Sequence, residues 1–285
     1  MDLAGAAQRL RLDLDAVAVS ASLTRAGVPH ALLKGPSTST WLYDPPRGYS
    51  DVDLLVPRSW VGRAVAALSH DGIATRSGGR VGEEAHHSLS MRTTSGFELD
   101  LHVSLPCVPV RGDLVWSTLA PHVAPLDLGI GTVPALDEPG RCLVVALHAL
   151  STDGSLGQKV EDLRRASNVA APSSWSVARE LARAMLAEDL YDGGLARLSP
   201  GSVELSHRAA LYFDDAPASA LALQRLRDAR WWERPRMVWR ELFPSVAFMR
   251  EFGSVSPSLR FWLVRSYVQR GRDLGHALLR RRPER

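Results

Sequence analysis

The chain has 285 residues, of which 45% are apolar, 23% charged and 7% aromatic, and its formal net charge is only +3. These proportions exclude the collagen-like, disordered and disulfide-rich classes, and the length suits one large domain or two modest ones. The small net charge also disfavours a protein that coats nucleic acid. Because no apolar run approaches the ~18–20 residues that span a bilayer, and the start carries acidic residues, we expect a cytoplasmic protein without a membrane partner.

The 34 basic residues include only two lysines, Lys34 and Lys159. So strong a preference for arginine is typical of a coding bias, and it favours a high-GC bacterial source. The first half of the chain alternates short apolar runs with helical patterns and turn residues. Its predicted elements are a helix over 6–26, a strand over 30–34, a helix over 37–43, a loop over 44–48, a strand over 51–56, a helix over 59–71, and two strands over 87–93 and 97–105 joined by a hairpin turn.

From about residue 138 onward the pattern is helical almost throughout. Helices are predicted over 138–151, 158–170, 173–190, 202–213, 217–230 and 258–281. This change from mixed strand and helix patterns to helical patterns predicts an α+β domain over residues 1–136, followed by an all-helical domain over 137–285.

Acidic side chains recur at alternate positions on two of the predicted strands. Asp51 and Asp53 lie two residues apart, so strand periodicity places both carboxylates on one face. On the later strand, Glu98, Asp100 and His102 share a face opposite an apolar one. If the two strands are neighbours in one sheet, three carboxylates converge and can hold two divalent cations about 3.5–4 Å apart. Without that adjacency, both stretches are simply amphipathic strands with one polar, solvent-exposed face.

A turn after the strand over 30–34 offers a second feature. The chain breaks at Gly35 and continues into a predicted helix whose first turn carries Ser37 and further hydroxyls. Unpaired N–H groups at a helix start suit a phosphate group. Pro36 has no N–H to donate, so phosphate contacts would fall to Ser37, deeper amides, Lys34 or Arg47.

Taken together, these motifs resemble the bacterial family of uncharacterised nucleotidyltransferases, within the DNA polymerase beta-like nucleotidyltransferase superfamily. The N-terminal motifs are the specific ones, and the helical region adds weaker matches. The residues that carry the resemblance are Leu33-Lys-Gly35, Arg47-x-x-x-Asp51-Val-Asp-Leu-Leu-Val56, Asp100-Leu-His102, His148, Lys159-Val-Glu-Asp-Leu163 and Phe243-Pro-Ser245.

The resemblance implies a nucleotidyltransferase-like mixed sheet with flanking helices in the first domain. It also implies transfer of a nucleoside monophosphate from ATP or another NTP to an acceptor hydroxyl, with Mg²⁺ or Mn²⁺ as cofactor and pyrophosphate as leaving group. Asp51, Asp53 and Asp100 would be the catalytic metal ligands. The nucleotide-binding residues would be Lys34, Gly35, Ser37, Arg47, Ser50 and Lys159.

Several assignments stay open at this point. His102, Glu98 and Asp162 are candidate substrate contacts, although His102 can equally be a half-buried strand histidine. Lys159 and Asp162 lie one helical turn apart and can be structural. The favoured acceptor is a small molecule or a modified peptide. Toxin-like action on RNA and a non-catalytic nucleotide-binding role are the alternatives, and neither the acceptor, the NTP base nor the oligomeric state follows from the sequence.

Overall fold

The computed structural model describes residues 3–76, 88–108, 113–151, 156–199 and 204–213, with a few isolated positions between 223 and 238. The helices predicted over 217–230 and 258–281 lie largely or wholly outside these residues. None of the described helices is long and apolar enough to cross a membrane.

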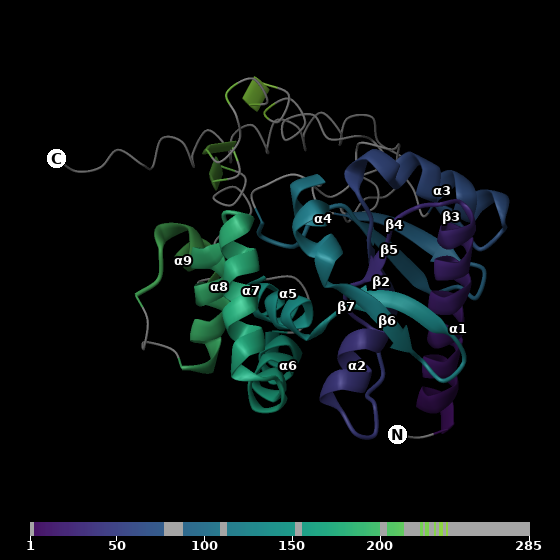
Figure 1. The fold of residues 1–285 in the computed structure, drawn as a ribbon, viewed down its shortest axis with the longest axis horizontal. Coiled ribbons are helices and arrows are strands. Elements are labelled where there is room, and N and C mark those ends of the chain that lie inside the picture. The colour runs from purple at the N-terminus through teal and green to yellow at the C-terminus, as the bar shows by residue number, and fades with distance from the viewer. Residues whose placement is uncertain are drawn as a thin grey trace, which may run out of the picture.

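A seven-stranded sheet in the order β3-β4-β5-β2-β1-β7-β6 forms the centre of the molecule (Figure 1). It is mixed, because the pairs β2–β5 and β1–β7 are parallel and the remaining pairs are antiparallel. Its strands are β1 (Ala31–Leu32), β2 (Asp51–Leu55), β3 (Ala74–Arg76), β4 (Ser88–Thr93), β5 (Glu98–His102), β6 (Val123–Asp127) and β7 (Thr132–Leu136).

Helices cover both faces of this sheet. On one face α1 packs against α3, β2 and β7, and on the other α5 packs against β7 and the later helices (Figure 1). Leu54 and Leu101 belong to the apolar cluster on the α1 face, whereas Leu33 and Leu55 belong to the cluster shared with α5–α9. The helices are α1 (Leu3–Arg25), α2 (Pro36–Leu42), α3 (Val61–His70), α4 (Asp113–Leu119), α5 (Glu138–Leu150), α6 (Leu156–Val169), α7 (Pro172–Ala184), α8 (Glu188–Leu195) and α9 (His207–Phe213).

The α+β class and the order of the predicted elements are confirmed, but several details of the prediction are wrong. Strands β3, β6 and β7 and helix α4 were not predicted, and the helix expected over 202–213 begins only at His207. The strand expected over 30–34 is only two residues long, and the strand expected over 97–105 ends at His102. The helix expected over 173–190 is two helices, because Leu186 adopts a left-handed backbone with a φ of 55° and ends α7. No glycine or proline marks this break in the sequence.

Candidate active site

The two central strands bring the predicted acidic residues together. In the parallel pair β2–β5, Asp53 lies opposite Asp100 and Asp51 lies opposite Glu98. Because alternate residues share a face, Asp51, Asp53 and Asp100 all lie on the face that also carries Leu55, toward the apolar cluster of α5–α9. The strand adjacency on which the sequence interpretation depended is therefore confirmed.

Asp53 is the most deeply buried of the three carboxylates, with 2% of its surface exposed. Its Oδ1 accepts a hydrogen bond of 2.7 Å from His102 Nε2 and lies 3.3 Å from the Lys34 ammonium. Burial alone would raise the pKa of Asp53, but Lys34 and His102 outweigh it and hold that pKa well below its usual range. Asp53 is therefore a permanently charged group at neutral pH.

Asp51 and Asp100 are held by hydroxyl groups at the more open side of the site. Ser50 Oγ lies 3.3 Å from Asp51 Oδ1, and Ser90 Oγ donates to Asp100 Oδ1 at 2.6 Å. Burial and the neighbouring charges of Asp53 and Asp100 raise the pKa of Asp51. Accumulated negative charge of this kind is relieved by a bound cation.

The donor set fits a divalent cation. The ligand atoms of Asp53, Asp100 and His102 lie within 4.8 Å of one another, and Asp51 adjoins them on β2. Carboxylate oxygens are the ligands that Mg²⁺ and Mn²⁺ prefer. Glu98 is farther out: it is exposed, and its carboxylate lies 4.0 Å from Arg92 at the surface.

The turn between β1 and α2 passes close behind Asp51. Gly35 has a φ of +62°, and a Cβ at this position would lie 3.1 Å from the backbone oxygen of Asp51. Only glycine combines this backbone conformation with such a close approach. Ser37 is fully buried, and its hydroxyl lies 3.4 Å from the carbonyl oxygens of Leu33 and Lys34. In this conformation the Ser37 hydroxyl donates to backbone carbonyl groups of the preceding turn.

Arg47 and Asp162 form a second polar cluster that joins the loop before β2 to α6. Arg47 Nη2 lies 2.7 Å from Asp162 Oδ2, and the Tyr43 hydroxyl donates to Asp162 Oδ1. Gln158 donates to both Tyr43 and Asp162, and the Arg165 guanidinium lies 4.3 Å from the centroid of the Tyr43 ring. Burial and Asp162 raise the pKa of Tyr43 to about 12, so its hydroxyl remains a donor.

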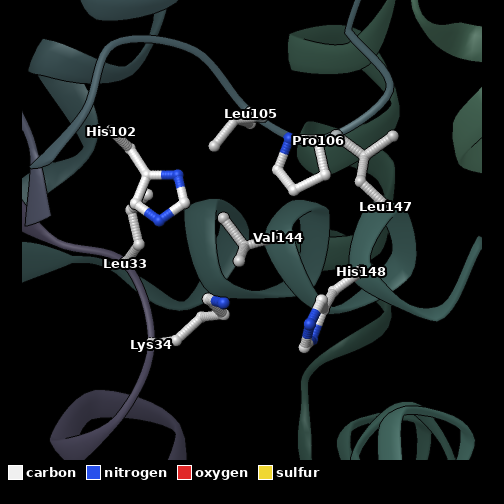
Figure 2. A pocket seen from close by; sticks show the side chains of 8 residues that line it. All are labelled: Leu33, Lys34, His102, Leu105, Pro106, Val144, Leu147 and His148. Carbon is white, nitrogen blue, oxygen red and sulfur yellow. The ribbon is translucent and has the colours of Figure 1, made fainter. Parts of the chain in front are cut away.

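Lys159 belongs to α6, and its side chain contacts Ser151 at the C-terminal end of α5. Only 4% of the surface of Lys159 is exposed. Its ammonium donates to the Ser151 carbonyl and hydroxyl oxygens at 3.1 and 2.9 Å. Near the acidic cluster, Lys34, His102 and His148 extend from three different elements toward a small cavity (Figure 2). The cavity is otherwise apolar and is also lined by Leu33, Leu105, Pro106, Val144 and Leu147.

The predicted residues therefore fall into distinct groups. Lys34, Asp51, Asp53, Asp100 and His102 gather around one point, with Ser50 at its edge, whereas Arg47 and Asp162 bind each other. Sequence reasoning missed Ser90 and Tyr43. A polar face on residues 88, 90 and 92 was the available signal for Ser90, since the hairpin register places it opposite Asp100. No local pattern points to Tyr43, whose partner is 119 residues away.

Comparisons with known proteins give one match to a family model. The model, described as uncharacterised nucleotidyltransferase, matches residues 3–197. No match was found among curated proteins.

Three similar solved structures are distant in sequence. An antigenic nucleotidyltransferase-like protein from Paracoccidioides brasiliensis is 16% identical, with a TM-score of 0.42 over 66% of this chain and 88% of that one. The antibiotic-resistance factor ANT(2'')-Ia is 14% identical, with a TM-score of 0.40 over 64% and 95% of the two chains. JHP933 from Helicobacter pylori is 14% identical, with a TM-score of 0.34 over 77% and 98%.

Proposed function

We propose that this chain, which belongs to the uncharacterised nucleotidyltransferase family, transfers a nucleoside monophosphate from an NTP to a hydroxyl of a small molecule or modified peptide. The observation that carries the proposal is the register of β2 and β5, which sets Asp53 beside Asp100 with Asp51 on the same face. Three carboxylates at one point suit a reaction in which cations stabilise phosphate charge.

In this proposal Asp51 and Asp53 would hold both Mg²⁺ or Mn²⁺ ions, and Asp100 would be a further ligand of the ion at the acceptor hydroxyl. The bound cation supplies charge neutralisation at the phosphates and lowers the pKa of the acceptor hydroxyl. His102 and Lys34 fix Asp53 through its Oδ1, which leaves the direction of Oδ2 defined. Ser90 orients Asp100 in the same way through its Oδ1.

The proposed reaction is a single displacement at the α-phosphorus, without a covalent enzyme intermediate. The acceptor oxygen forms a bond to the α-phosphorus, and the bond from that phosphorus to the oxygen bridging to the β-phosphate breaks. Pyrophosphate leaves with the electron pair, and the acceptor proton passes to solvent on the side of Asp100. This chain's contribution is to orient the two oxygens in line and to neutralise the charge on the phosphates.

The remaining nucleotide contacts are proposed for residues around the two clusters. Lys34 and Arg47 would neutralise triphosphate charge, and Ser50 at the edge of the acidic cluster would contact the nucleotide. Gly35 lets the β1–α2 turn approach Asp51 closely. Ser37 would contact phosphate only after turning its hydroxyl away from the carbonyl groups of Leu33 and Lys34. Lys159 would have to exchange its Ser151 contacts for phosphate oxygens.

A binding assay tests the proposal without knowledge of the acceptor. We expect an NTP to raise the melting temperature only when Mg²⁺ or Mn²⁺ is present, because the triphosphate and the carboxylates are both anionic. Asp53→Asn and Asp51→Asn should abolish this stabilisation while the proteins stay folded. The matched control is Asp192→Asn, which removes a carboxylate paired with Arg179 at 2.7 Å in the helical region. Metal-independent stabilisation would contradict the metal role and favour a non-catalytic nucleotide-binding protein.

Turnover is measured as the release of pyrophosphate and as the transfer of label from an α-labelled NTP to a mixture of hydroxyl compounds. Retained turnover in Asp51→Asn or Asp53→Asn would refute the mechanism. Label appearing in an RNA pool, and not in small molecules or peptides, would replace the favoured acceptor class with RNA.

A further inference from the structure

The second polar cluster joins the loop before β2 to the helical region. Tyr43 directly follows the last residue of α2, Arg47 lies in the loop, and Asp162 belongs to α6. Helices α2 and α6 are in contact. From Arg47 the chain continues through Ser50 to Asp51, so the same loop leads into the acidic cluster. The second polar cluster therefore connects α6 to the candidate active site.

The two oxygens of the Asp162 carboxylate have different partners. Oδ2 lies 2.7 Å from Arg47 Nη2. Oδ1 accepts hydrogen bonds from the Tyr43 hydroxyl and, at 3.0 Å, from Gln158 Nε2. Gln158 Nε2 also donates to the Tyr43 hydroxyl oxygen at 2.8 Å, which leaves the Tyr43 proton for Asp162. Because two donors fix Oδ1, the direction of Oδ2 is defined, and it points to Arg47.

The hydroxyl and the ring of Tyr43 make separate contributions. The Cζ atoms of Arg47 and Arg165 lie 5.3 and 4.3 Å from the centroid of the ring. These contacts do not involve the hydroxyl group, whose partner Asp162 is buried. A lost donor in a buried network is not readily replaced by water. Removal of the hydroxyl alone therefore changes the support of Asp162 and keeps the ring in place.

Arg47 is held and is still accessible. Its Nη2 is bound by Asp162 and its Nη1 donates to the Gly48 carbonyl oxygen at 3.0 Å, while 27% of the side chain is exposed. An arginine that is held beforehand loses less rotamer entropy when it binds a phosphate. The two donors on Oδ1 also share the negative charge of Asp162, so Arg47 keeps more of its positive charge for an anion. Both effects predict weaker phosphate binding when the Tyr43 hydroxyl is removed.

We propose that Tyr43 is a positioning residue, which holds Arg47 for the triphosphate through Asp162. This inference rests on the proposed function and adds a role to it. Tyr43 acts without touching the nucleotide, and the carboxylate through which it acts comes from α6. The helical region thereby takes part in nucleotide binding, although the three acidic metal ligands all belong to the sheet.

Tyr43→Phe tests the proposal, because it removes the hydroxyl and keeps the ring. In titrations of the full chain with ATP and Mg²⁺, we expect the dissociation constant of ATP to rise about three- to tenfold. In turnover assays the KM for ATP should rise by a similar factor, with a change in kcat of less than about twofold. The matched control is Tyr191→Phe, which removes a hydroxyl that donates to the Trp175 carbonyl oxygen at 3.1 Å in the helical region. It should leave the dissociation constant of ATP unchanged, whatever it does to the melting temperature of the free protein.

A double-variant cycle tests whether Tyr43 acts on Arg47. Arg47→Met removes the guanidinium, so the addition of Tyr43→Phe should raise the dissociation constant of ATP by less than about twofold more. Additive losses would overturn the proposal, and so would a Tyr43→Phe variant that binds ATP as the wild type does. Failure of the proposed function gives a different result: ATP with Mg²⁺ would then not bind even the wild type, and both proposals would be overturned.

Discussion

Replacing Gly35 by alanine tests how tightly the β1–α2 turn is tied to Asp51. Two costs add at this position. A residue with a side chain at a φ of +62° loses about 1–2 kcal/mol. The new Cβ would also lie 3.1 Å from the Asp51 carbonyl oxygen, a contact that only a shift of one backbone segment can relieve. With about 1–2 kcal/mol for that overpacking, we expect Gly35→Ala to destabilise the protein by about 3 kcal/mol.

Gly27→Ala is the matched control, because it separates the two costs. Gly27 has a φ of +65° and open space around its Cβ position, so only the backbone cost applies there. At about 2–4 °C per kcal/mol, we expect the melting temperature to decrease by about 6–12 °C for the roughly 3 kcal/mol of Gly35→Ala and by about 3–6 °C for the roughly 1.5 kcal/mol of Gly27→Ala. Only Gly35→Ala should also reduce metal-dependent stabilisation by NTP, since the Asp51 backbone must move. Equal melting temperatures and equal NTP effects in the two variants would refute this reasoning.

Two further predictions concern buried polar groups. Asp162→Asn removes the anionic partner of Arg47, so the KM for NTP should rise about tenfold with a smaller change in kcat. Asp162→Glu should recover part of the loss. Steady-state kinetics measure both constants with Asp192→Asn as the control, and equal KM values for Asp162→Asn and Asp192→Asn would contradict the prediction. Burial lowers the pKa of His30 below 6.5, so protons bind the unfolded chain preferentially and stability should fall as the pH drops below that value. His30→Asn does not titrate, and its melting temperature should decline less steeply than that of the wild type between about pH 7.5 and about pH 5; parallel declines would contradict the assignment.

Local patterns were sufficient for the elements that carry the acidic residues. Alternation along residues 97–103 fixed which side chains share a face, and the apolar run from Asp51 predicted its strand. Patterns failed where proline or backbone conformation decides the structure. Pro125 and Pro134 hide β6 and β7, because proline argues against a strand interior, and here the two prolines lie opposite each other in the register of an edge hairpin.

The candidate site was predictable as far as it depends on strand faces, and not beyond. Three carboxylates and His102 follow from period-two alternation once the strands are adjacent, and that adjacency came from a resemblance and not from periodicity. The contact of Arg47 with Asp162 spans 115 residues, and no local rule connects them.

The two lysines illustrate what geometry adds to composition. Arginine predominates among the basic residues. The two lysine ammonium groups nevertheless both make polar contacts within the fold: Lys34 contacts Asp53, and Lys159 contacts Ser151. An ammonium group has three donors to satisfy, whereas a guanidinium has five in a fixed plane, so the compact group suits a confined site better. Lys34 also sets the charge balance: with it, the three carboxylates carry two more negative charges than positive ones. One divalent cation balances that excess, and a second would have no local counter-charge until triphosphate arrives. We therefore expect one cation to bind the free protein and the second to bind together with the NTP.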